Sequence, residues 1–170
     1  KRLSSEKLVL LLIIASQTAS AKIRMPEIFT DHMVLQQDQP IAVWGWAEPG
    51  EQITLVVNAT MLKAEAGTDG SWSLAAPAIK FAQTQGKAVR LEVSGTGEKL
   101  EYKDVVIGEV WLASGQSNMN RPVDAATIQA AGFPNIRMFT SNGSIPRRNS
   151  LNDTVGWVAC TPETIAVCGD

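Results

Sequence analysis

The sequence has few of the residues that most often carry chemistry: one histidine, His32, and two cysteines among 170 residues. Any mechanism with a histidine base must therefore use His32 or a residue that this chain does not contain. Two cysteines exclude a disulfide-dense scaffold and a four-cysteine zinc site. We see no metal-ligand spacing and no glycine-rich phosphate loop, and expect no metal or cofactor. The net charge of −2 gives no electrostatic footprint for nucleic acid.

The sequence also lacks an apolar run long enough to span a bilayer. Its longest run, Leu8–Ala15, has 8 residues, whereas a membrane helix needs about 20. Basic residues precede this run, and the small-x-small pattern Ala19–Ala21 follows it. We therefore predict that residues 1–21 are an export signal and that the mature protein is periplasmic or extracellular, without stable membrane insertion. The alternative is a buried strand or helix at the start of the domain.

Residues 22–104 carry short β-prone runs separated by turn signals. The runs are Ile41–Trp46, Ile53–Val57, Ser71–Leu74 and Val89–Val93. Strands of this length with a turn every eight to twelve residues are typical of a β-sandwich. We predict an all-β sandwich-like domain over this range.

The pattern changes after Asp104. Val105–Ala113 is almost continuously apolar, which is typical of a strand buried on both faces of a parallel sheet. Asp124–Ala131 is alanine-rich and favours a helix, and Ile136–Thr140 is predicted as the next strand. Strand, turn, helix and strand together predict a βαβ unit in residues 105–170.

Ser117 is the candidate catalytic residue, because it follows the predicted buried strand and precedes the helix. Ligands bind at this edge of open α/β sheets, where N–H groups at a helix start can stabilise an oxyanion. The spacing Gly115-x-Ser117 is similar to a nucleophile elbow, but Met119 replaces the second glycine. From this pattern alone, Ser117 is either a nucleophile or only the N-cap of the helix.

Several blocks of the sequence resemble the sialate O-acetylesterase family, which belongs to the SGNH hydrolases. They are Pro26–Gln36, Val43–Gly50, Asp69–Trp72, Ile107–Met119, Asn135–Phe139 and Gly156–Thr164. The resemblance extends from about residue 25 to residue 164. It implies a β-rich domain followed by an α/β/α sandwich, and a secreted enzyme that hydrolyses O-acetyl esters on sugars. The substrate would be sialic acid or another acetylated glycan.

The same resemblance assigns roles to the block around Ser117. Ser117 aligns with the nucleophile, its own N–H would donate to the oxyanion, and Gly115, Gln116 and Asn118 would shape the site. The family's catalytic histidine and aspartate lie near its C-terminus, and we find neither block here. We therefore expect a catalytically incomplete fragment in which residues 105–170 are the truncated start of the α/β/α domain.

Two alternatives remain open at this point. His32 could pair with Asp31 and serve Ser117 as a base, although we favour a structural turn for this histidine. The chain could also be a non-enzymatic β-module that binds carbohydrate or a protein partner. Trp44 and Trp46 share one face of a predicted strand, where we favour core packing over a sugar platform. We expect Cys160 and Cys168 to be unpaired.

Overall fold

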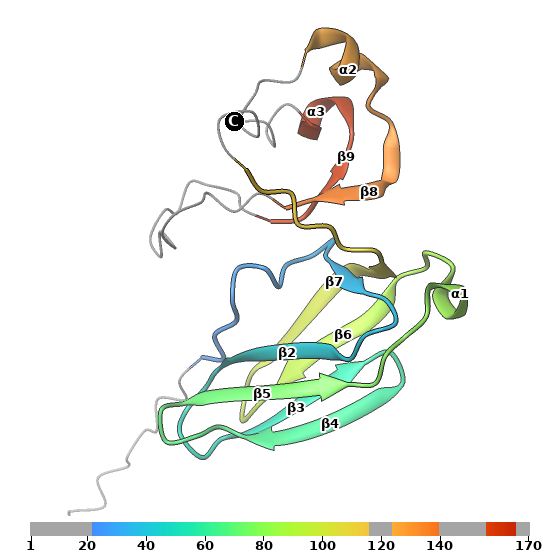
Figure 1. The fold of residues 1–170 in the computed structure, drawn as a ribbon. Helices are drawn as coiled ribbons and strands as arrows, with labels where there is room; N and C mark the ends of the chain where they lie inside the picture. The colour runs from blue at the N-terminus through green and yellow to red at the C-terminus, as the bar shows by residue number, and fades with distance from the viewer. Residues whose placement is uncertain (1–21, 116–123, 140–155, 166–170) are drawn as a thin grey trace, which may run out of the picture.

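The computed structural model describes residues 22–115, 124–139 and 156–165, and this part of the chain is mostly β-strand (Figure 1). The predicted export signal, residues 1–21, and the site residues Gln116, Ser117 and Asn118 lie outside the described residues. Within them, no helix is both long and apolar enough to cross a membrane.

The described strands form three sheets. A five-stranded sheet has the order β1 (Val34–Gln36), β7 (Lys99–Gly108), β6 (Val89–Ser94), β3 (Gln52–Val57) and β4 (Thr60–Glu65). The two-stranded sheets are β2 (Ile41–Trp46) with β5 (Ser71–Ala76), and β8 (Phe133–Met138) with β9 (Val158–Cys160). The helices are short: α1 (Phe81–Thr84), α2 (Ala125–Ala130) and α3 (Pro162–Ile165). The β1–β7 pair is parallel and the other described pairs are antiparallel.

The core lies between the curled five-stranded sheet and the β2–β5 pair (Figure 1). In β2 the side chains alternate, with Ile41 and Val43 buried and Ala42 and Trp44 exposed, as the period of two requires. The side chains that meet them come from the larger sheet: Ile53, Leu55, Val57, Leu91, Val93, Val105 and Ile107. The prediction that this part of the chain is built of β-strands is confirmed.

The tryptophans of this region do not share one role. Trp72 on β5 is buried in the core, with 4% of its surface exposed, whereas Trp44 is 41% exposed. Trp46 lies under the guanidinium of Arg24, which is 4.7 Å from its ring centroid. The predicted core packing is therefore wrong for Trp44, whereas Trp72 on the neighbouring strand lies in the core. Alternation predicts that Trp44 and Trp46 share a face, but not which face of β2 is inside.

The predicted βαβ unit is not formed by the described residues. β7 runs from Lys99 to Gly108, across the division predicted after Asp104, and pairs with β6 and β1 in the five-stranded sheet. The apolar run continues beyond this strand, but Trp111 and Leu112 are 86% and 93% exposed. An apolar run indicates burial without indicating which sheet the strand joins.

The segment after the exit from β7 contains elements of the predicted types. α2 lies within the predicted helix 124–131, and β8 overlaps the predicted strand 136–140. However, β8 pairs antiparallel with β9 and not with a parallel neighbour. The described residues therefore show no α/β/α layering, and the boundary between two domains stays a prediction.

Candidate functional site

The described chain approaches the predicted nucleophile along residues 109–115. This segment leaves the end of β7 without joining a described helix or strand, and its side chains are exposed. Gly115, which we predicted to shape the site, is its last described residue and is also exposed. The structure thus describes this segment up to two residues before Ser117, whereas the geometry at Gln116, Ser117 and Asn118 lies outside the described residues.

The helix after this segment is not capped by Ser117. α2 begins at Ala125, and its N-cap is Asp124, whose carboxylate accepts from the N–H of Thr127 at 2.8 Å and from the Thr127 hydroxyl at 3.0 Å. Ser117 lies seven residues before that cap. The alternative in which Ser117 caps α2 is therefore wrong, whereas the expectation that N–H groups at a helix start lie beside Ser117 stays a prediction, because Ser117 lies outside the described residues.

Two side chains at the end of β1, Gln36 and the following Gln37, contact the chain where it leaves β7. Glu109 accepts two hydrogen bonds, from Gln36 Nε2 at 3.1 Å and from Gln37 Nε2 at 2.5 Å. Gln36 Oε1 in turn accepts from the N–H of Val110 at 2.8 Å. The hydrogen bond from Gln37, followed by that from Gln36, lowers the pKa of Glu109 below its usual value.

His32 pairs with Asp104 and not with Asp31. Its Nδ1 donates to Asp104 Oδ2 at 2.8 Å, while Asp31 accepts from the N–H of Lys103 at 2.7 Å. His32 also has a φ of 66°, and its own N–H donates to the Lys103 carbonyl at 2.9 Å. The proposed Asp31–His32 pair is therefore wrong, and the interpretation of His32 as a turn residue is supported. Its distance to Ser117 lies outside the described residues.

Arg137 of β8 completes this contact. Its Nη2 pairs with Asp104 Oδ1 at 3.0 Å, and its Nη1 donates to the carbonyl of His32 at 3.0 Å and to the carbonyl of Asp104. The hydrogen bond from His32, and then those from Arg137, hold the pKa of Asp104 below its usual value. Sequence reasoning missed Asp104 and Arg137, because no local pattern joins residues 33 positions apart. We call these three residues the His32–Asp104–Arg137 cluster.

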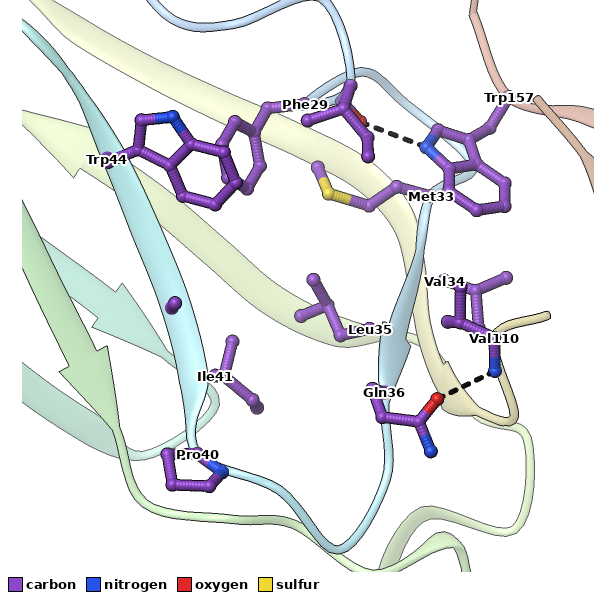
Figure 2. Close-up of a pocket in the computed structure, with 12 residues that line it drawn as sticks. Phe29, Met33, Val34, Leu35, Gln36, Pro40, Ile41, Trp44, Val110 and Trp157 are labelled. Carbon is purple, nitrogen blue, oxygen red and sulfur yellow. Dashed lines mark hydrogen bonds between the residues drawn. The ribbon is translucent and has the colours of Figure 1, made fainter. Parts of the chain in front are cut away.

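A shallow apolar hollow lies between β1 and β2 and is shown in Figure 2. It has a volume of about 210 Å³, and its lining includes Leu35, Ile41, Trp44, Val110 and Trp157. None of the residues that line it is ionisable, so the hollow offers no acid or base of its own. Val110 belongs to the segment that leads to Ser117, and the hollow therefore borders that segment.

Trp157 attaches the segment before β9 to the loop that precedes β1. Its indole Nε1 donates to the Ile28 carbonyl at 2.9 Å, and its main-chain N–H donates to Thr30 Oγ1 at 3.1 Å. Cys160 on β9 is buried and free, as expected, whereas Cys168 lies outside the described residues. Among the described residues there is no group of three or more potential metal ligands.

Comparisons with known proteins show that this chain is similar to esterases. No family model matches it. It is 29% identical over 148 residues to sialate O-acetylesterase of Rattus norvegicus, covering 78% of this chain and 27% of that protein. It is 32% identical over 131 residues to the human sialate O-acetylesterase, covering 68% of this chain and 24% of that protein. The chain thus spans about a quarter of the length of these curated relatives.

A solved structure is similar over more of the chain. A carbohydrate acetylesterase from Xanthomonas citri aligns with a TM-score of 0.75 and 31% sequence identity, covering 85% of this chain and 34% of that one. At this identity and coverage the likeness extends to both sequence and fold.

Proposed function

Because this chain is homologous to the sialate O-acetylesterases, we propose that the protein is a carbohydrate esterase that removes O-acetyl groups from sugars. The observation that carries the proposal is the agreement between two kinds of relative. The similar sequences are sialate O-acetylesterases, and the similar structure is a carbohydrate acetylesterase. The substrate class is therefore an O-acetylated sugar, either sialic acid or another acetylated glycan.

In the proposed reaction, Ser117 Oγ attacks the acetyl carbonyl carbon and gives up its proton to a base. The sugar hydroxyl leaves with a proton, and an acetyl-enzyme forms on Ser117. Water then hydrolyses this ester, releases acetate and restores the serine. The N–H of Ser117 would donate to the oxyanion, with Gly115, Gln116 and Asn118 around it. The reaction needs no cofactor.

We do not assign the base to His32. The Nδ1 of His32 donates to Asp104, and the main-chain carbonyl of His32 accepts from Arg137. His32 therefore joins two parts of the chain. The contact with Asp104 is also what the histidine of a catalytic triad has at its Nδ1. In the family that this chain resembles, however, the catalytic histidine lies in a later block of the sequence. The proton from Ser117 is therefore assigned to a histidine of that block, which this chain does not contain.

We also infer that the residues after β7, within the range 105–170, are the start of an α/β/α domain. The exposed Trp111 and Leu112 support this, since neighbouring large apolar side chains in water usually indicate a surface that something else covers. The export pattern in residues 1–21 supports a periplasmic or extracellular location.

The proposal predicts acetate release by the product of the complete gene. Purified protein should release acetate from 9-O-acetylated sialic acid, from an acetylated neutral glycan, or from both, and an enzymatic acetate assay measures this. The 170-residue chain should not hydrolyse p-nitrophenyl acetate above background, because the resemblance places the catalytic histidine in a block that is not found in this sequence. No acetate from either sugar would contradict the esterase and leave the binding module as the alternative.

A further inference from the structure

The parallel strands β1 and β7 end side by side, and the next residues of each strand meet. Gln36 pairs in register with Gly108, and the N–H of Gln37 donates to the Gly108 carbonyl at 2.9 Å. Beyond this hydrogen bond the chain turns into the exposed segment 109–115. Its direction at that point depends on the contacts of Glu109 and Val110.

Those contacts join three side chains, which we call the β7 exit clasp: Gln36, Gln37 and Glu109. The Glu109 carboxylate accepts one amide hydrogen bond with each of its oxygens, at 3.1 Å and 2.5 Å. With its Nε2 held there, Gln36 presents Oε1 to the N–H of Val110 (Figure 2). The Glu109 carboxylate thus helps to orient the Gln36 amide, whose Nε2 also donates to the Gln37 carbonyl at 3.2 Å and whose Oε1 accepts from the first main-chain N–H beyond Glu109.

The clasp also reaches a third part of the chain. Gln37 Oε1 accepts from the N–H of Phe81 at 3.1 Å, at the start of α1. An amide held at both ends has little freedom to rotate, so Gln37 fixes one oxygen of Glu109 against the body of the fold. An exposed glutamate at a strand end needs no such partners to be stable. The network is therefore more than solvation of a surface charge.

We propose that Glu109 is a positioning residue, which acts through Gln36 and Gln37 to fix the start of the segment 109–115, the described part of the chain that precedes Ser117 in the sequence. Ser117 lies seven residues beyond Val110. This proposal rests on the proposed function. Glu109 does not touch the substrate in this account, so its loss should affect the placement of the nucleophile and not the binding of the sugar. A misplacement of about 1 Å can cost about 10²-fold in rate.

Two measurements test the proposal with one set of variants. In the 170-residue chain, amide hydrogen exchange at Val110 should accelerate about tenfold or more in Glu109→Ala and in Gln36→Ala, while Ile107 stays protected. In the product of the complete gene, Glu109→Ala should lower kcat about tenfold or more and leave KM within about twofold. Glu109→Gln, which keeps one acceptor oxygen, should recover part of both effects.

Glu101→Ala is the matched control, because Glu101 is an exposed glutamate within β7, and its carboxylate contacts Lys99 at 3.6 Å. Unchanged exchange at Val110 would overturn the proposal at its structural step. Faster exchange with an unchanged kcat, or an effect confined to KM, would overturn the positioning role. Absence of acetate release by the wild-type protein would be a failure of the proposed function, and the positioning role would fall with it.

Discussion

Ser117→Ala in the product of the complete gene is expected to lower the rate of acetate release by at least about 10³-fold. The reason is chemical: alanine has no oxygen to form the acetyl-enzyme, and only binding and oxyanion stabilisation would remain. The measurement is kcat for acetate release from the acetylated sugar that the wild-type protein hydrolyses best.

Ser114→Ala is the control for this variant. Ser114 lies three residues before Ser117, in the described exposed segment, and the proposed reaction gives it no role. It should keep kcat within about twofold of the wild type, as expected for a surface substitution away from special contacts. Equal losses in both variants would show that the segment tolerates no change, and a Ser117→Ala enzyme with full activity would exclude this nucleophile.

Arg137→Ala is expected to loosen the attachment of the β8–β9 pair to the β-rich part. The Arg137 side chain is 9% exposed, and its removal takes the Arg137 donor from Asp104 Oδ1 and from two main-chain carbonyls, while His32 still donates to Asp104 Oδ2. Because Asp104 is 46% exposed, water replaces part of the loss. We expect the substitution to weaken this attachment by about 2 kcal/mol of free energy, near the value for a hydrogen bond to a charged group.

Hydrogen exchange in the 170-residue chain measures this effect locally. The indole N–H of Trp157, bonded to the Ile28 carbonyl, should exchange faster in Arg137→Ala, while Leu55 in the core should not change. Arg90→Ala is the control, since Arg90 forms an ion pair with Glu92 on β6 and is 56% exposed. In this variant Glu92 keeps its contact with Lys99 at 2.8 Å. Unchanged exchange at Trp157 would contradict the attachment.

The difference in stability between the wild type and Arg137→Ala should depend on pH in a defined direction. The pKa of Asp104 is lowered from its ordinary value of 3.8 by His32 and then by Arg137. A carboxyl group with a lowered pKa stabilises the fold above its unfolded pKa, and this contribution is lost as the pH falls through the folded pKa. The ion-pair part of the difference between wild type and Arg137→Ala should therefore be present near pH 7. It should shrink as the pH falls below 3.8.

The sequence pattern predicted the helices and strands that depend only on residues close together in the chain. The β-prone run Ile41–Trp46 predicted β2 at the same residues, and the alanine-rich run predicted α2 within one residue at each end. The apolar run Val105–Ala113 was predicted as one buried strand, yet only its first part lies in β7. Which sheet a strand joins depends on pairings between distant residues, and β1 and β7 are about 70 residues apart.

The site was predictable only as far as its motif extends. The block around Ser117 helped to predict the family, and curated sialate O-acetylesterases do align with this chain. The partners of its neighbours were not predictable. His32 pairs with Asp104, 72 residues away, and Glu109 with Gln36, 73 residues away. Both contacts arise because β1 lies against β7, and no spacing within the sequence reports that.

The central claim, a serine esterase with Ser117 as its nucleophile, is tested most directly by covalent labelling. The product of the complete gene would be treated with a fluorophosphonate, which forms a stable bond with activated serine hydroxyls. Peptide mass spectrometry would then locate the label. The account predicts one labelled serine, Ser117, together with loss of acetate release in proportion to labelling. Inactivation with the label on another residue, or acetate release that survives complete labelling of Ser117, would contradict it.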